Sequence, residues 1–226
     1  MPGLLVLGTD TEVGKTYVAC NILRQLVRSG IAPAAYKPIA SGAGGIDESD
    51  AFQLWRASGG MGSIEQVGPQ SYAAPVAPPI AAELEGRLVD IEAILQGAKD
   101  WNGKCDWLLV EGAGGLMSPI TFDWTNADLA RMLGKPIVLV TENRLGVVNQ
   151  VLTALAAANS MELTVGCIVL NEPRRRHSGD LSSSSNERLL SLFIQRLPHK
   201  PLLTRLGYGA EEFCPGVEWN QIAGRV

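Results

Sequence analysis

Short apolar runs alternate with amphipathic segments along the whole chain. In residues 18–27, Val18, Ile22 and Leu26 recur at helical spacing, and Ser29-Gly30 follows as a stop signal. Strand-length runs that alternate with such helices predict a mostly parallel sheet, flanked by helices on both faces, in a single α/β domain over residues 1–226. The apolar runs that predict strands lie at residues 4–7, 34–38, 107–115, 136–140, 163–171 and 201–203.

The segments between these runs differ in character. Ser184 and Glu187 have the spacing of a capping box, which predicts that a helix begins there and runs to about residue 197. The glycine-rich stretch 39–45 is predicted to be a loop. Residues 59–79, rich in glycine and proline, are predicted to form a long irregular segment on the substrate side, a loop or lid. Further helices are predicted at residues 51–55, 90–96, 127–133 and 146–158.

A glycine-bounded turn joins the first apolar run to the first helix. It runs from Gly8 through Gly14 to Lys15 and Thr16, and it is one residue longer than G-x-x-x-x-G-K-[ST]. A strand, a turn of this kind and a helix start direct backbone N–H groups at phosphate oxygens. Lys15 can lie between β- and γ-phosphates, and the Thr16 hydroxyl can ligate Mg²⁺. The alternative is a chance Gly-Lys-Thr in a surface turn.

Other residues with suitable chemistry lie where predicted strands and helices meet. Lys37 ends the second strand, and ligand contacts gather at such carboxyl ends in open α/β sheets. Glu111 follows a buried run and precedes glycines, as does the carboxylate that holds magnesium beside a phosphate loop, although it could simply cap a turn. Asp50 is either part of a helix cap or a metal contact. Asn171 ends a strand with an amide that can recognise a base edge.

Composition narrows the classes of function. The formal net charge is −4 and basic residues are dispersed, so nucleic acid is not an expected partner. No apolar run reaches about 18 residues and residues 1–3 lead straight into a strand, so we expect neither a membrane span nor an export signal, and a cytoplasmic location. The four cysteines form no C-x-x-C pair and there are two histidines, which argues against a zinc site. Residues 174–176 are either a solvated arginine loop or a phosphate clamp.

Three segments together resemble one enzyme family. Residues 8–16, 36–42 and 110–115, in that order, are similar to those of the dethiobiotin synthetases, and the resemblance extends from residue 4 to about residue 203. It implies a P-loop fold and a ligase of biotin biosynthesis. The family makes dethiobiotin from 7,8-diaminononanoate, CO2 and MgATP, and releases ADP and phosphate. It also implies a homodimer with the substrate site at the interface.

The resemblance also implies roles for individual residues. Lys37, Lys15 and Thr11 would be catalytic, and Ser41 would contact the substrate. The helix start that receives the substrate carboxylate across the dimer interface would be Gly146, Val147, Val148 and Asn149. Magnesium would be held by Thr16, Asp50 and Glu111. The nucleotide would be bound by Glu12, Val13, Gly14, Lys15, Thr16, Tyr17, Asp50, Glu111, Gly112, Ala113, Gly114, Asn171, Glu172, Leu206, Gly207 and Tyr208.

Two features bear on specificity. Residues 204–208 depart from the Gly-x-Ile-Pro-Trp-like turn that many members have beside the base, so the preferred base is left open. The rival function is a nucleotide-switch ATPase of the partition or division-site type. Such ATPases carry a second lysine early in the loop, where this chain has Thr9-Asp10, and commonly a basic tail, where this chain has Glu211-Glu212.

Overall fold

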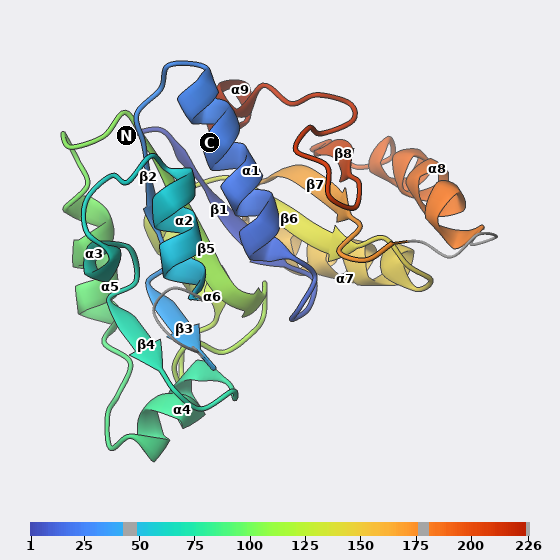
Figure 1. The fold of residues 1–226 in the computed structure, drawn as a ribbon. Helices are drawn as coiled ribbons and strands as arrows, with labels where there is room; N and C mark the ends of the chain where they lie inside the picture. Colours follow the sequence, from blue (N-terminus) through green and yellow to red (C-terminus); the bar gives the residue numbers. More distant parts are fainter. Residues whose placement is uncertain (43–48, 176–180, 225–226) are drawn as a thin grey trace.

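A computed structural model describes residues 1–42, 49–175 and 181–224 (Figure 1). Its centre is a six-stranded sheet in the order β2-β5-β1-β6-β7-β8, in which every pair of neighbouring strands is parallel. Helices α1 and α2 cover one face, and α6 and α7 cover the other. The predicted α/β fold is therefore confirmed. The strands are β1 (Gly3–Gly8), β2 (Pro33–Tyr36), β5 (Trp107–Gly115), β6 (Ile137–Glu142), β7 (Val165–Asn171) and β8 (Leu202–Leu206).

The helices begin and end close to the predicted positions where their pattern is long. They are α1 (Lys15–Arg28), α2 (Asp50–Ala57), α3 (Ile64–Val67), α4 (Pro78–Leu84), α5 (Ile91–Lys99), α6 (Asn126–Leu133), α7 (Val147–Ser160), α8 (Ser182–Ile194) and α9 (Trp219–Ala223). Within the described ranges, every helix is too short or too polar to pass through a lipid bilayer.

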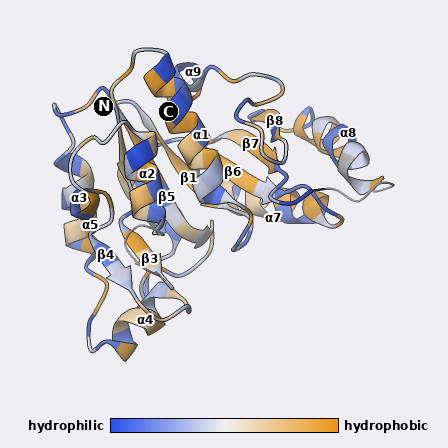
Figure 2. Cartoon of the chain, viewed as in Figure 1, coloured by the Kyte–Doolittle hydropathy of each residue, from blue (hydrophilic) through white to orange (hydrophobic). Residues whose placement is uncertain are grey.

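The core lies between the sheet and the helices on its two faces. All residues of β1, β2 and β7 are buried, as expected for parallel strands that are covered on both sides. Figure 2 shows the apolar residues along β6 and β7 and the banded, two-sided pattern of α1. A sheet packed in this way holds the carboxyl ends of its parallel strands rigidly in one row. The candidate site lies at these strand ends.

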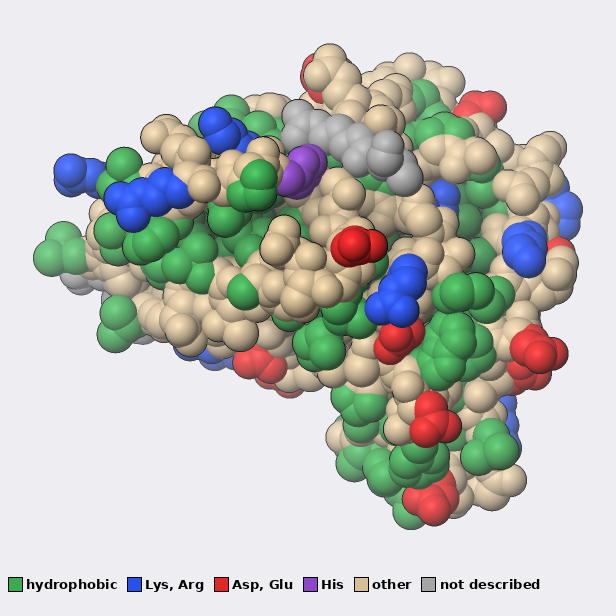
Figure 3. All heavy atoms as spheres, turned by 180° about the vertical axis from the view of Figure 1, so that it is seen from behind, with side chains coloured by type: hydrophobic (Ala, Val, Ile, Leu, Met, Phe, Trp, Pro, Cys, Tyr) green, Lys and Arg blue, Asp and Glu red, His purple; other side chains and the backbone are tan. Residues whose placement is uncertain are grey.

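The predicted loop at 39–45 and the predicted irregular segment at 59–79 are both wrong in part. Residues Ile39–Ser41 form β3, which pairs in parallel with β4 (Gln70–Tyr72), and α3 and the start of α4 also fall within 59–79. Residues 43–48 lie outside the described residues. Strands β3 and β4 and helix α4 form a small lobe, here called the β3–β4 lobe, and Figures 1 and 3 show that it protrudes from the main body. Strands of three residues carry too little periodicity to be recognised, and a second apolar cluster with Ile39, Tyr72 and Ile120 stabilises them.

The predicted capping box of Ser184 and Glu187 is also wrong. Helix α8 begins at Ser182, so Ser184 lies in its first turn and its hydroxyl donates to the carbonyl of Leu181 at 3.4 Å. Glu187 instead lies 3.9 Å from Arg205 of β8. Several serines in a row offer more than one start of similar quality, and contacts outside the helix decide among them.

Candidate active site

The turn between β1 and α1 is shaped to bind an anion. Gly14 has a φ of +82° at the N-cap of α1, a conformation in which a side chain is strained. A Cβ at Gly14 would also lie 2.2 Å from Nδ2 of Asn171. On the other side of the turn, the hydroxyl of Thr9 bonds that of Thr141 on β6 at 2.8 Å. The turn is therefore held from both sides, with the N-terminus of α1 open toward the cleft.

Strand pairing places Lys37 beside Glu111. Tyr36 of β2 is opposite Val110 of β5, so the next residue on each strand reaches the same carboxyl edge of the sheet. Nζ of Lys37 lies 2.5 Å from Oε1 of Glu111 and 2.6 Å from Oδ2 of Asp50. Lys37 is 5% exposed and Glu111 is fully buried, so this is an ion cluster with little solvent around its centre.

Thr16 completes the same cluster from the first turn of α1. Its Oγ1 lies 3.0 Å from Oδ1 of Asp50 and 2.8 Å from Oε1 of Glu111, so the hydroxyl can donate to either carboxylate. The neighbouring Ser49 caps α2, accepting from the backbone N–H of Phe52 at 3.1 Å. Because Ser49 does the capping, the carboxylate of Asp50 is left to point into the cleft.

The charges of the cleft shift one another's pKa values. Burial lowers the pKa of Lys15, and the nearby carboxylate of Glu111 offsets this only in part. Burial also opposes the charged forms of Lys37 and Asp50. For Lys37, the carboxylates of Glu111 and Asp50 outweigh burial and raise the pKa. For Asp50, the charge and hydrogen bond of Lys37 outweigh burial and lower the pKa. Lys37 therefore stays a cation at neutral pH within this cluster.

One cavity of about 380 Å³ connects these groups. It is lined by the turn residues Thr11, Glu12, Gly14, Lys15 and Thr16, by Lys37, Ala40, Ser41 and Asp50, and by Glu111, Ala113 and Gly114. Val13 and Gly112, for which the resemblance also implies nucleotide roles, are not in this lining and lie behind it. Val13 is 3% exposed and supports the turn, and a Cβ at Gly112 would lie 2.4 Å from a methyl of Leu7. The cleft thus unites ends of three neighbouring strands, β1, β2 and β5.

A second group of residues lies on the other side of the turn. Asn171 is fully buried and donates from Nδ2 to the carbonyl of Val13 at 2.8 Å. Its strand pairs with β8 so that Asn171 is opposite Leu206, and the N–H of Glu172 donates to the carbonyl of Leu206. Tyr208 beyond β8 is 54% exposed. Leu206 therefore lies beside Asn171 at the end of β8, and Gly207 and Tyr208 follow directly after that strand.

The segment Gly146–Asn149 is not part of the cavity lining. It lies at the start of α7, after β6, with Gly146 at a φ of +92°. The side chain of Val147 is fully buried in the core, whereas Gly146 and Asn149 are exposed. Any ligand contact of Val147 therefore has to come from its backbone.

Sequence reasoning missed two residues that hold the glycine end of β5. Nδ2 of Asn126 donates to the carbonyls of Ala113 at 2.7 Å and Gly115 at 2.8 Å. The hydroxyl of Ser118 accepts from the N–H of Gly115 at 2.8 Å. The only local signal was the spacing of Thr125 and Asp128, which form a capping box at the start of α6. Nothing in that spacing indicates a bond to a strand 11 or 13 residues earlier.

The oxygen atoms of the cluster fit a magnesium ion. Oε2 of Glu111 is buried and has no hydrogen-bond partner among the described residues. Two carboxylates and the Thr16 hydroxyl are hard oxygen donors of the kind that Mg²⁺ takes together with substrate phosphates and water. No group of three His, Cys, Asp or Glu in the described part of the chain gathers as a metal site.

Fold and site together define a P-loop nucleotide-binding protein. The solved structures that it resembles include the MinC:MinD cell division complex of Aquifex aeolicus, with a TM-score of 0.53 and 13% identity over 92% of this chain and 81% of that one. Chloroplast FtsY of Physcomitrella patens matches with a TM-score of 0.52 and 17% identity, over 98% of this chain and 63% of the FtsY chain. At such identities the likeness shows the fold alone.

Sequence relatives show the family. A family model described as "AAA domain" matches residues 2–206. The ATP-dependent dethiobiotin synthetase of Anaeromyxobacter sp. (strain K) is 42% identical over 91% of this chain and 93% of its own length. That of Anaeromyxobacter dehalogenans (strain 2CP-C) is 38% identical over 91% and 90%. The chain therefore belongs to the family of ATP-dependent dethiobiotin synthetases, which are ligases.

Proposed function

We propose that this protein forms dethiobiotin from 7,8-diaminononanoate, CO2 and MgATP, releasing ADP and phosphate. The observation that carries the proposal is the cleft itself, in which the phosphate-binding turn, Lys37 and two carboxylates line one cavity. Membership of the synthetase family supplies the substrates. We further infer that residues 1–226 act as one catalytic domain, because the two apolar clusters meet at Leu133, which packs against both.

The proposed reaction has three steps. One substrate amine adds to CO2 and loses a proton, which gives a carbamate. A carbamate oxygen then attacks the γ-phosphorus of ATP, and the bond from that phosphorus to the ADP oxygen breaks. Finally the second amine attacks the carbonyl carbon of the mixed anhydride and displaces phosphate, which closes the ureido ring. No protein side chain has to act as a covalent nucleophile.

The chain's own residues would offset the charge that these steps concentrate. A carbamate and a γ-phosphate are both anionic, so their approach needs cations on both sides. Lys15 comes from the start of α1 and Lys37 from the end of β2, and both line the cavity together with Thr11. The low exposure of Lys37 means that water screens its charge poorly, which strengthens its effect on nearby anions. Exclusion of water from the closed site would also protect the anhydride from hydrolysis.

Magnesium would be held by Thr16, Asp50 and Glu111, and when bound it would neutralise phosphate charge. Lys37 contacts both of these carboxylates, so the ammonium group that would meet the carbamate belongs to the same cluster as the proposed metal ligands. Ala113 and Gly114 line the same wall of the cavity and would meet the phosphates through their backbone.

The substrate would extend from Ser41 toward a second copy of the chain. Ser41 ends β3 and lines the cavity, whereas Gly146–Asn149 lies outside that lining. The N–H of Val147 donates to the carbonyl of Arg144, so the N–H groups of Val148 and Asn149 in the first turn of α7 would be the ones to meet a carboxylate. A homodimer that brings this helix start of one copy to the cleft of the other would complete the site, and we include that assembly in the proposal.

The experiment that tests this function is a product assay. Purified protein is incubated with 7,8-diaminononanoate, bicarbonate and MgATP, and the product is identified by mass. We expect dethiobiotin and ADP in equal amounts, with no phosphate release when the diamine is left out. Phosphate release that does not depend on the diamine would instead favour the nucleotide-switch ATPase.

A further inference from the structure

The loop between β8 and α9 is fixed at its base by contacts that do not involve Tyr17. This loop, residues 207–213, is here called the β8 loop. At its base, the backbone of Arg205 exchanges two hydrogen bonds with that of Cys214, at 3.0 and 2.9 Å. Phe213 is 5% exposed and packs edge-on against Trp219, with ring centroids 5.0 Å apart. Both ends of the loop are therefore anchored in the body of the protein.

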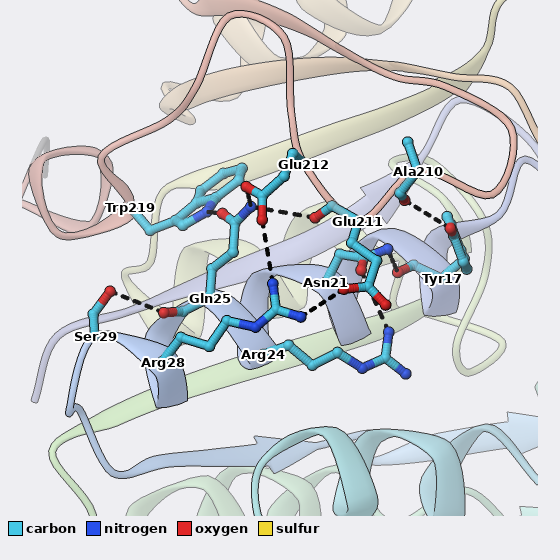
Figure 4. A network of polar contacts seen from close by, with 10 residues as sticks. All are labelled: Tyr17, Asn21, Arg24, Gln25, Arg28, Ser29, Ala210, Glu211, Glu212 and Trp219. Carbon is cyan, nitrogen blue, oxygen red and sulfur yellow. Dashed lines mark hydrogen bonds and ion pairs between the residues drawn. The ribbon is translucent and has the colours of Figure 1, made fainter.

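The tip of the β8 loop is held separately, on the outer face of α1 (Figure 4). The hydroxyl of Tyr17 donates to the carbonyl of Ala210 at 2.7 Å. Two turns further along α1, Nε2 of Gln25 donates to Glu212 at 2.9 Å. Because the base is anchored on its own, these contacts decide where the tip lies rather than whether the loop forms.

Tyr17 is placed to link this tip to the phosphate-binding turn. It is the third residue of α1, directly after Lys15 and Thr16. On the loop side, the N–H of Ala210 donates to the carbonyl of Gly207 at 3.0 Å, which closes a turn with Tyr208 inside it. One hydroxyl thus connects the residues after the phosphate turn to the turn that presents Tyr208.

Tyr208 offers a surface that suits a nucleotide base. The residue is 54% exposed, and the guanidinium of Arg175 lies 5.7 Å from the centroid of its ring. An exposed aromatic ring with a neighbouring guanidinium is a stacking platform for bases. The strand that precedes it, β8, is adjacent to β7, whose Asn171 contacts the phosphate turn at Val13. The platform is therefore on the nucleotide side of the molecule.

We propose that Tyr17 is a positioning residue for the nucleotide base. Its hydroxyl holds the β8 loop so that the Tyr208 platform stands at a fixed distance from the phosphate-binding turn. This rests on the proposed function only in that a nucleoside triphosphate is the substrate. Tyr17 does not touch the base in this arrangement, so its effect is confined to ligands that carry one.

The test compares a nucleotide with a ligand that lacks a base. Affinities for MgADP and for magnesium tripolyphosphate are measured by calorimetry in the full-length protein and in Tyr17→Phe, which removes only the hydroxyl. We expect ADP affinity to fall about 3- to 10-fold, the usual loss for one hydrogen bond, with tripolyphosphate affinity unchanged. Tyr208→Ala should show the same selective loss. In turnover, KM for ATP should rise while kcat and KM for the diamine stay the same.

A matched control is Tyr72→Phe. It removes a tyrosine hydroxyl that bonds Gln70 at 3.2 Å in the β3–β4 lobe, away from α1, so both affinities should stay as they are. Equal loss of ADP and tripolyphosphate affinity in Tyr17→Phe would overturn the proposal, because Tyr17 would then act on the phosphates. Unchanged ADP affinity would overturn it as well. A protein that binds ADP as described but forms no dethiobiotin would refute the proposed reaction and leave this inference standing.

Discussion

In two clusters among the residues that the structure describes, one cation lies between two carboxylates, and these clusters differ in solvation. In the cleft, Lys37 lies between Asp50 and Glu111, whose side chains are 42% and 0% exposed. On α1, Arg28 lies between Glu211 and Glu212, whose side chains are 58% and 73% exposed. The distances overlap, from 2.5 to 2.6 Å in the cleft and from 2.5 to 3.2 Å on α1.

The comparison teaches that geometry alone does not indicate how much an ion cluster contributes. An exposed pair adds little, because water and salt screen it and two long side chains lose freedom. A buried pair has already paid for desolvation, so removing one partner leaves an uncompensated charge. Groups held in this way are also available for chemistry, since an incoming cation or anion can replace the partner. The following experiments test that difference, from the largest expected effect to the smallest.

Lys37→Gln should have the largest effect. Phosphate release with diaminononanoate and bicarbonate should fall by about 100-fold or more, because a fixed cation beside the transferring charge is lost. The free energy of unfolding without ligands should fall by about 3 kcal/mol, since Glu111 is left without its partner. Turnover is followed by phosphate assay and stability by urea denaturation. Near-normal turnover would remove Lys37 from the mechanism.

Glu111→Ala should act through the metal. The magnesium concentration that gives half-maximal nucleotide binding should rise about tenfold or more, because one charged oxygen ligand is missing. Nucleotide binding is titrated at several magnesium concentrations. Glu142→Gln is the matched control, because Glu142 ends β6, which lies on the other side of β1 from β5, and pairs with Arg144 instead. An unchanged metal dependence in Glu111→Ala would refute the ligand assignment.

Asn126→Leu should loosen the strand end that carries Glu111. Two carbonyls at the end of β5 lose their donor, and unsatisfied groups that are partly buried should lower the free energy of unfolding by about 2 kcal/mol. Denaturant titration measures this. If the loss of stability comes only from fraying of α6, hydrogen exchange at Gly114 and Gly115 will be the same as in the unchanged protein. That result would contradict the proposed support of β5 by Asn126.

Arg28→Ala should have the smallest effect. The hydrogen bond and charge of Arg28 lower the pKa of Glu211, so any stabilisation is present above the ordinary carboxyl pKa of 4.5 and is lost as the pH falls through the lowered value. Thermal unfolding at neutral pH should barely change, and the two proteins should converge in acid. A clear drop at neutral pH would show that the exposed cluster contributes as much as the buried one.

Much of this architecture could be predicted because its signals are local. The turn from Gly8 to Thr16 carries its own pattern of glycines, lysine and threonine. The positions of Lys37 and Glu111 follow from two apolar runs that each end at the same edge of a parallel sheet. Long strands and helices that bury a whole side repeat their pattern often enough to be recognised.

The rest depends on contacts between distant residues. The short strands β3 and β4 form because another part of the chain covers them, and their own three residues do not indicate it. The bond from Tyr17 to Ala210 joins residues 193 positions apart, and no local spacing predicts it. Nor does the sequence indicate that Lys37 lies between the two carboxylates proposed for magnesium, since that depends on how side chains from three separate segments meet.

The central claim is that a carbamate oxygen, and not water, attacks the γ-phosphate in the cleft of Lys15 and Lys37. It is tested most directly by a brief single-turnover reaction with bicarbonate labelled with oxygen-18, in which the released phosphate is examined by mass. The proposed steps predict that each phosphate released with dethiobiotin carries one oxygen atom from the bicarbonate. In a parallel reaction the water carries the label and the bicarbonate does not. Phosphate that takes its new oxygen from this labelled water would contradict the claim.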